Sequence, residues 1–338
     1  MTLLTTDSFD NYTPLGLRWT DVVNGAFSTG RSGPSSYRSV GNGSPGGYIE
    51  RQLAGTATTI IVGCAVLQTL SPGSGISGWI SLIENGVGTH VDLRFNGSNF
   101  YVTRSGALLG TGATFVQQSR WYSIEMKVVI HDTTGSIELR IDGVVELNLT
   151  NIDTRSGGTG FVDRIRLGRN VNFPQFDAFF DDLYVCDTAG SVNNDFLGDV
   201  RVEALLPTAN GNSSVLVGSD GNSTDNYLLV DEASPNSDTD YVESSAVGDK
   251  DTYVFGNLSP SSGTVFGVLV LPYIRKTDAG IRKMASVARV SGTEVDSADK
   301  TLSTSYAYMP DVRETKPGGG AWTISDVNGA EFGIKVTA

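Results

Sequence analysis

Hydrophobic and polar residues alternate with a period of two over long stretches of the chain, a pattern that predicts β-strands with one side in a core. In the first half, the clearest strands are predicted at residues 79–84, 90–95 and 100–104, and the turns between them contain Asn85-Gly86 and Asn96-Gly97. Asn-Gly supplies the positive φ angles that two-residue hairpin turns require. We therefore expect three consecutive antiparallel strands in this region.

A second run of alternation predicts a meander of longer strands. Strands are expected at residues 121–130, 136–141 and 144–149, and Asp142-Gly143 forms the turn between the last two. A short strand is expected at 165–168, and a long strand that closes a sheet is expected at 179–186. No segment before residue 190 has the 3.6-residue period of an amphipathic helix.

The stretch 187–195 is polar, small and turn-forming, so we predict a domain boundary near residue 190. Residues 1–190 form the first predicted domain and residues 191–338 the second. The alternating pattern resumes after the boundary, with long strands expected at 264–275 and 301–309 and one short helical turn at 322–328. The second domain is therefore predicted to be another antiparallel β-sandwich.

Composition agrees with an all-β protein and excludes several functions. The 338 residues include 41 Gly, 39% are hydrophobic and 18% are charged, which argues against disorder and against a coiled coil. The formal net charge of -13 would repel nucleic-acid phosphates, so no nucleic acid is expected as a partner. No apolar run reaches the roughly 18 residues of a membrane helix, so no membrane insertion is expected.

Residues 1–190 resemble the laminin-G and concanavalin A-like jelly-roll domains. The resemblance is carried by the opening Asp7-Ser8-Phe9-Asp10, by residues 121–128, by the hairpin at 135–143 and by the closing strand at 180–185. In such domains the first and last strands are neighbours. The resemblance thus implies an N-terminal jelly-roll sandwich in which Asp7 and Asp10 lie beside Asp181 and Asp182.

The whole chain also resembles a group of bacteriophage virion proteins that place a jelly roll ahead of a second β-domain. This resemblance is carried by residues 181–202, 302–308 and 331–336. It implies a structural protein of the virion, made in the cytoplasm of the bacterial host and exposed on the particle as a capsid decoration or a tail or fibre component. Its expected partners are other virion proteins and copies of itself, and its expected roles are assembly or host-surface attachment.

Catalysis has no candidate constellation in the sequence, and we expect no enzymatic activity. No strand carries the alternating carboxylates with which concanavalin A-like glycoside hydrolases cleave sugars. His90 and His131 each flank a turn, which favours exposed loop histidines over catalytic ones. Nucleophile-elbow, phosphate-loop and paired-cysteine motifs are absent from the sequence.

A calcium ion is the one cofactor that the sequence suggests. Ca²⁺ takes carboxylate and carbonyl oxygens, and the pairing of the terminal strands would gather Asp7, Asp10, Asp181 and Asp182. The alternative is that Asp181 and Asp182 accept hydrogen bonds from loop amides. The acidic residues between 207 and 251 have no ligand spacing and are interpreted as a solvated surface.

Aromatic residues suggest an alternative function, a lectin-like module that binds carbohydrate with or without calcium. Trp19, Tyr37 and Tyr48 lie in or near a Gly, Ser and Pro rich stretch at 25–47 that is long enough for a functional loop. These three residues are the candidate ligand contacts, and host-surface glycans are the candidate ligands. Trp79 and Trp121, at strand starts, are interpreted as core residues.

Overall fold

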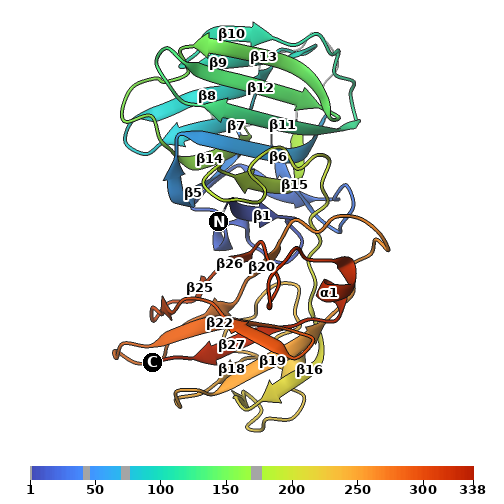
Figure 1. Ribbon diagram of the computed structural model, residues 1–338, viewed down its shortest axis with the longest axis vertical. Coiled ribbons are helices and arrows are strands. Elements are labelled where there is room, and N and C mark those ends of the chain that lie inside the picture. The colour runs from blue at the N-terminus through green and yellow to red at the C-terminus, as the bar shows by residue number, and fades with distance from the viewer. Residues whose placement is uncertain (1, 41–45, 70–76, 169–176) are drawn as a thin grey trace. The chain divides into compact units, whose positions relative to one another are not determined.

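The computed structural model describes residues 2–40, 46–69, 77–168 and 177–338 (Figure 1). It divides into two compact units, which we describe separately. Unit 1 comprises Met1–Asp10 and Pro14–Val202, and unit 2 comprises Asn11–Thr13 and Glu203–Ala338. Within the described ranges, no helix is long and apolar enough to span a bilayer.

The first sheet of unit 1, sheet A, is antiparallel. Its strands are β1 (Leu3–Asp7), β3 (Gly25–Ser28), β4 (Ser36–Ser39), β6 (Thr59–Gln68), β11 (Trp121–Val129), β12 (Gly135–Ile141), β13 (Val144–Ile152) and β15 (Ala178–Cys186). They lie in the order β13, β12, β11, β6, β15, β4, β3, and β1 also pairs with β15. The predicted meander is confirmed as β11, β12 and β13.

The second sheet, sheet B, is antiparallel too, and a short 3-10 helix, η1 (Leu15–Leu17), precedes its first strand. Its strands are β2 (Asp21–Val23), β5 (Tyr48–Ala57), β7 (Ser77–Glu84), β8 (Gly88–Phe95), β9 (Phe100–Arg104), β10 (Ala107–Thr111) and β14 (Val162–Gly168). They lie in the order β10, β9, β8, β7, β14, β5, β2. The three consecutive strands predicted between residues 79 and 104 are confirmed as β7, β8 and β9.

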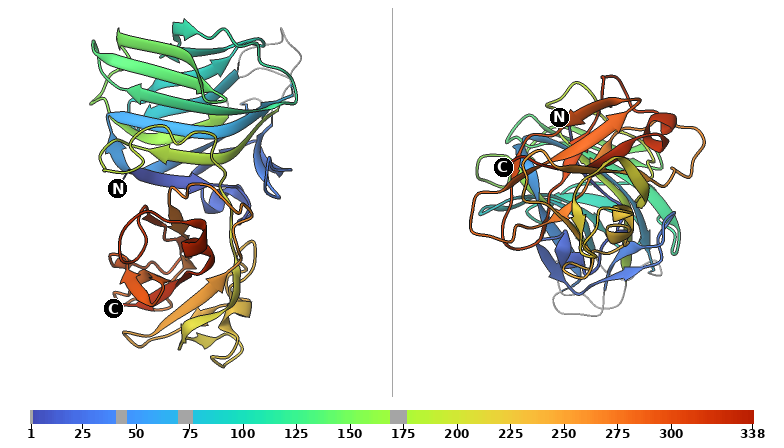
Figure 2. Two further views of the ribbon diagram at one scale, coloured as in Figure 1. Left: turned by 45° about the vertical axis from the view of Figure 1, so that its right-hand side comes forward. Right: turned by 90° about the horizontal axis from the view of Figure 1, so that it is seen from below.

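The two sheets form a jelly-roll sandwich (Figures 1 and 2). Aromatic side chains pack in the core between them. Trp79 of sheet B lies edge-on to Phe100 at 5.0 Å between ring centroids and to Phe180 of sheet A at 6.0 Å. Trp79 is fully buried, as expected, whereas Trp121 is half-buried. Cys64 and Cys186 are buried and free.

The first and last strands of the sandwich are neighbours, as the resemblance implied. Leu3 of β1 pairs with Cys186 of β15, and Asp7 pairs with Leu183. β1 ends at Asp7, so Ser8 and Asp10 follow the strand and do not belong to it.

Unit 1 extends to Val202, beyond the boundary predicted near residue 190. The reason is that residues 187–202, which we call the strap, hydrogen-bond to sheet A. The Gly198 N–H donates to Glu125 Oε1 at 2.7 Å, and the Val202 N–H donates to Asp182 Oδ1 at 2.8 Å. A polar, turn-forming composition thus marks a segment that packs on the first unit before the second unit begins.

Unit 2 is also antiparallel β-structure. Its elements are β16 (Pro207–Ser214), β17 (Val217–Gly218), η2 (Asn226–Leu229), β18 (Val242–Glu243), β19 (Lys250–Phe255), β20 (Val268–Val270), β21 (Tyr273–Ile274), β22 (Lys283–Val290), β23 (Thr293–Asp296), β24 (Lys300–Thr301), β25 (Ala307–Tyr308), β26 (Asp311–Arg313), α1 (Ile324–Asn328) and β27 (Glu331–Val336). The main sheet has the order β16, β19, β27, β22, β23, and β24 pairs with β22. The remaining strands pair as β17 with β18, β20 with β26, and β21 with β25.

Of two sequence expectations for unit 2, one is confirmed and the other is wrong. The helical turn at 322–328 is confirmed as α1, which begins with a capping box between Thr323 and Asp326. The long strand expected at 264–275 is wrong, since it is split into β20 and β21 on either side of Pro272. Proline has no N–H for a ladder hydrogen bond, so it interrupts the strand. The alternation of hydrophobic and polar residues does not predict this interruption.

The centre of sheet A leaves no room for a side chain at Gly63 of β6. A Cβ atom there would overlap the ring of Tyr184, which lies over this glycine where β15 bulges. We predict that Gly63→Ala lowers the free energy of unfolding by about 1–3 kcal/mol, because the overlap forces Tyr184 and β15 to move. Urea denaturation of the full chain measures the change.

Gly55→Ala in β5 is the matched control, because a Cβ there meets open space. Its effect should stay within about 0.5 kcal/mol. Equal stability of the two variants would contradict the close packing of Tyr184 on Gly63.

Candidate functional site

The outward side of sheet B carries many polar side chains. Val91, Leu93 and Phe95 of β8 are fully buried in the core, so the alternate residues of the strand point outward. Pairing with the neighbouring strands extends this outward set in both directions. We call the set the sheet-B face, and it consists of Tyr48, Glu50, Ser81, His90, Asp92, Arg94, Tyr101, Thr103, Arg164 and Arg166.

One row of this face crosses five neighbouring strands. Glu50 of β5 is paired with Arg166 of β14, Arg166 with Ser81 of β7, Ser81 with Asp92 of β8, and Asp92 with Thr103 of β9. Neighbouring strands lie about 4.8 Å apart, so the row is about 19 Å long. Glu50, Ser81, Asp92 and Thr103 are buried, at 2–8% exposure. The row therefore lies beneath the partly exposed arginine side chains of the face.

Arginine side chains at one end of the row are held by Glu50. Glu50 accepts from Arg164 Nη1 at 3.1 Å and from Arg166 Nη2 at 2.6 Å. The guanidinium of Arg166 lies 4.5 Å from the centre of the Tyr48 ring, which places a cation over an aromatic face. The Arg164 and Arg166 side chains are 23% and 14% exposed, so their orientation is fixed while part of each stays open to solvent.

Asp92, Arg94 and Tyr101 form a second cluster at the other end of the row. Arg94 Nη2 donates to Asp92 Oδ2 at 2.8 Å, and Arg94 is paired across strands with Tyr101. Desolvation lowers the pKa of Arg94, but the hydrogen bond and charge of Asp92, with Tyr101, outweigh it and hold that pKa above its usual range. Burial raises the pKa of Tyr101 against the opposing charge of Arg94, so its hydroxyl stays protonated at neutral pH.

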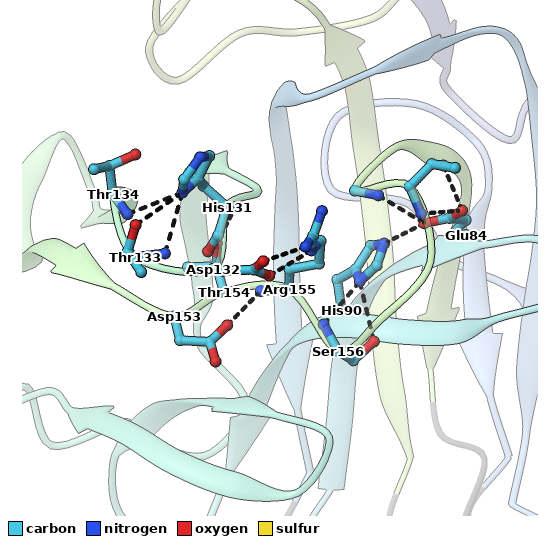
Figure 3. A network of polar contacts seen from close by, with 12 residues as sticks. Glu84, His90, His131, Asp132, Thr133, Thr134, Asp153, Thr154, Arg155 and Ser156 are labelled. Atoms are coloured by element: carbon cyan, nitrogen blue, oxygen red, sulfur yellow. Dashed lines mark hydrogen bonds and ion pairs between the residues drawn. The ribbon is translucent and has the colours of Figure 1, made fainter.

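His90 closes the face at the start of β8 and is fully buried, so the expected exposed loop histidine is wrong here. Its Nε2 lies 3.0 Å from Glu84 Oε2, and its Nδ1 lies 3.0 Å from Ser156 Oγ (Figure 3). Ser156 belongs to the connection between β13 and β14, which folds over the imidazole. Arg155, the residue before Ser156, forms an ion pair with Asp132. Both of these side chains are partly exposed to solvent.

His131 is exposed, as expected. Its Nδ1 accepts hydrogen bonds from the backbone N–H groups of Thr133 and Thr134, both at 3.1 Å (Figure 3). This histidine therefore orders the turn before β12.

The outward side of sheet A differs, because the strap crosses it. Glu125 is buried and accepts from the Tyr184 hydroxyl as well as from Gly198. The Phe196 ring lies 4.0 Å below the guanidinium of Arg140, and Lys127 donates to Asp195 at 3.1 Å. The polar groups of sheet A thus bind the chain's own strap, whereas those of sheet B bind one another.

Two of the three predicted ligand contacts are wrong, because their side chains are in the core. Trp19 is 1% exposed and donates its indole N–H to Asp7 Oδ2 at 3.2 Å. Tyr37 is fully buried and stacks on Phe180 at 5.6 Å between centroids. A Gly-rich neighbourhood suggested loops, but Tyr37 lies in β4, and residues 41–45 of that stretch lie outside the described residues. Tyr48 is half-buried and belongs to the sheet-B face.

The four carboxylates suggested for calcium already have partners. Asp7 accepts from Phe9 and Arg18, and Asp10 accepts from the Ser35 N–H at 2.8 Å. No group of three or more His, Cys, Asp and Glu side chains in the described ranges is arranged to hold a metal ion.

The alternative for Asp181 and Asp182 is confirmed. Asp181 accepts from the Arg31 N–H at 2.7 Å, and Asp182 accepts from the Val202 N–H at 2.8 Å. Both carboxylates are buried, and they tie loop and strap amides to β15.

The sheet-B face was missed in the sequence, although its signal is present there. Residues 90–95 alternate His, Val, Asp, Leu, Arg, Phe, so three chemically active side chains share one side of a strand. The alternation was used only to predict the strand. Ser156 carried no signal, because it lies 66 residues from His90 and in a loop.

Comparison with known proteins shows related folds. No protein-family model matches the chain, and no curated protein matches it. The cellulose induced protein Cip1 is 14% identical with a TM-score of 0.44, over 59% of this chain and 99% of that one. The alginate lyase AlgAT5 from polysaccharide lyase family 7 is 11% identical with a TM-score of 0.36, over 47% of this chain and 81% of that one.

A sialidase is 10% identical with a TM-score of 0.37 over 49% of this chain, and the chain spans only 17% of its length. The class defined by the strand order is a concanavalin A-like jelly roll followed by a second antiparallel β-unit.

The buried Asp181 should make the stability of unit 1 depend on pH. Burial raises its pKa to about 7, and repulsion from Asp182 adds to the effect. A raised pKa means that the contribution of Asp181 to stability is complete below its ordinary value of 3.8 and is lost as pH rises through about 7. We predict that Asp181→Asn flattens the fall in Tm between pH 4 and pH 7.

Asp132→Asn, at an exposed carboxylate, is the control and should keep the wild-type slope. Thermal unfolding in a pH series measures both. A variant at Asp181 with the same slope as the wild type would contradict the assignment.

Proposed function

We propose that unit 1 is a carbohydrate-binding module and that the sheet-B face is its binding surface. The observation that carries this proposal is a set of partly exposed guanidinium groups, those of Arg94, Arg164 and Arg166, held by buried carboxylates. The half-buried rings of Tyr48 and Tyr101 lie beside them. A sugar chain offers hydroxyl groups at short, regular intervals and an apolar face on each ring. Charged donors with aromatic rings beside them match both features.

The fixed geometry of the charged groups supports binding of a neutral or anionic glycan. Arg164 and Arg166 are oriented by Glu50, and Arg94 is oriented by Asp92. Side chains that are already ordered lose little entropy when a ligand binds, so their hydrogen bonds contribute more of their strength to affinity. The guanidinium groups retain donors on their solvent side, and hydrogen bonds from charged donors are the stronger kind.

The difference between the two outward faces also supports this choice. The strap occupies polar groups on sheet A, so the corresponding groups there serve the fold. On sheet B the arginines of the face are held by carboxylate side chains, and they can exchange such a partner for a sugar hydroxyl without breaking backbone structure. The sheet-B face is therefore the better candidate for a ligand.

We further propose that this module acts on the surface of a bacteriophage particle, as a capsid decoration or a tail or fibre component that attaches to host-surface glycans. The support is the whole-chain resemblance carried by residues 181–202, 302–308 and 331–336. Association with copies of itself follows from the symmetric positions that such components occupy. Mass spectrometry of purified particles from the phage that encodes this chain should detect it, and a particle without it would contradict the virion role.

Glycan binding should depend on the arginines and tyrosines of the face. We predict that the full chain binds on a glycan array, and that Arg166→Ala and Tyr48→Ala each weaken the best interaction about tenfold or more. The first change removes charged donors and the second removes a ring that supports Arg166. Isothermal titration with the selected glycan gives the affinities.

Arg120→Ala is the matched control, because Arg120 also pairs with a carboxylate, that of Asp142, and lies 4.6 Å from the centre of a tyrosine ring, that of Tyr122. It lies before β11 in sheet A, so its loss should leave the affinity unchanged. A folded protein that binds no glycan on the array, or binding that survives both variants of the face, would refute the proposal.

A further inference from the structure

Three side chains at the start of the sheet-B face are arranged as nucleophile, base and carboxylate (Figure 3). Ser156 Oγ lies 3.0 Å from His90 Nδ1, and His90 Nε2 lies 3.0 Å from Glu84 Oε2. The three residues come from the end of β7, the start of β8 and the connection between β13 and β14. A hydroxyl, an imidazole and a carboxylate in sequence are the parts of an activated serine.

The hydrogen bonds around His90 fix its tautomer. The backbone N–H of Ser156 donates to Nδ1 at 3.1 Å, so Nδ1 carries the lone pair. The proton is then on Nε2, which donates to Glu84 and lies 3.1 Å from the carbonyl oxygen of Phe161. The lone pair of the base consequently points to Ser156.

Glu84 is held as an anion. Burial acts to raise the pKa of Glu84, but hydrogen bonds from the Thr159 hydroxyl and N–H, from the Gly160 N–H and from His90 outweigh burial and lower it to about 2. The Thr159 N–H donates to Oε1 at 2.9 Å, and the Gly160 N–H donates to Oε2 at 3.0 Å. A carboxylate that stays charged can stabilise the imidazolium that forms when His90 takes a proton.

The two residues after Ser156 are exposed glycines. Gly157 and Gly158 have positive φ angles of 140° and 64°. A Cβ atom at Gly158 would lie 2.6 Å from Glu84 Oε2, so the backbone here packs against the carboxylate of the site. Among the described residues, neither backbone N–H donates to another backbone group.

We propose that Ser156 is the nucleophile of an esterase site that removes acyl groups from sugars bound on the sheet-B face, so the choice of a sugar ester rests on the proposed function. His90 and Asp92 are alternate residues of β8, about 7 Å apart along the strand. On this proposal, a sugar held over Asp92 would carry its acyl group toward His90 and Ser156. An ester suits the site, because its alcohol leaving group needs one proton and His90 supplies one.

The reaction balances with water as the only co-reactant. Ser156 Oγ bonds to the acyl carbon while its proton passes to His90 Nδ1. The bond from the acyl carbon to the sugar oxygen then breaks, and that oxygen takes the proton from Nδ1, which leaves an acyl-serine. Water attacks the acyl carbon and gives a proton to His90 Nδ1. The bond from the acyl carbon to Ser156 Oγ then breaks, and Nδ1 passes that proton to Oγ as the carboxylic acid leaves.

A fluorophosphonate probe and p-nitrophenyl acetate test the nucleophile in the full chain without any sugar. We expect peptide mass spectrometry to place the phosphonyl group on Ser156, and Ser156→Ala to lose labelling and at least about 1,000-fold of the esterase rate. Ser191→Ala, at an exposed serine of the strap, should keep both. An unchanged thermal unfolding curve for Ser156→Ala shows that the loss is not unfolding.

A folded wild-type chain that neither takes the probe nor hydrolyses the ester would overturn the proposal, as would labelling that persists in Ser156→Ala. Because the small ester does not use the sugar-binding row, this result is independent of the glycan array. Labelled Ser156 without glycan binding would leave the esterase and remove the sugar ester as its substrate. Glycan binding without labelling would leave the binding module alone.

Discussion

The alternation of side chains along β8 is the constraint on which the sheet-B face depends. Val91, Leu93 and Phe95 are fully buried between the sheets, so Asp92 and Arg94 must point outward. A shift of one residue in the pairing would move the charged side chains into the core and the apolar ones into solvent. The stability of the sandwich core therefore fixes the position of every group on the face.

The same constraint acts on sheet A with another result. Its outward polar groups, Glu125, Asp182 and Tyr184, bind backbone groups of the strap or its neighbouring side chains. Glu125 and Tyr184 are satisfied by the strap and by each other, as buried polar groups require, and Asp182 Oδ2 lies 3.6 Å from Arg31 Nη1. The two faces of one sandwich thus differ, since one holds the strap, whereas the arginines of the other are held by carboxylates of the same sheet.

Much of the architecture of unit 1 could be predicted, because strand alternation and Asn-Gly or Asp-Gly turns are local signals. The hairpins of β7, β8 and β9 and of β11, β12 and β13 follow from them directly. The pairing of β1 with β15 came only from the resemblance, because the two strands are far apart in the sequence. The long strand expected at 264–275 failed because Pro272 removes a ladder hydrogen bond, and alternation does not register that.

The candidate site could not be predicted to the same extent. Trp19 and Tyr37 sit in Gly-rich sequence, yet their large rings complete the core, and burial depends on packing that local sequence does not encode. Glu50 and Arg166 are brought together by cross-strand pairing between β5 and β14. The register that joins them is set by the core, and it becomes visible only in three dimensions.

A glycan bound across β5, β14, β7, β8 and β9 should be visible in a crystal structure of the full chain with the glycan selected on the array. Its sugar rings should lie against Tyr48 and Tyr101, with hydroxyl groups hydrogen-bonded to Arg166 and Asp92. A glycan seated on sheet A or on unit 2, with the sheet-B face empty, would contradict the proposed binding surface.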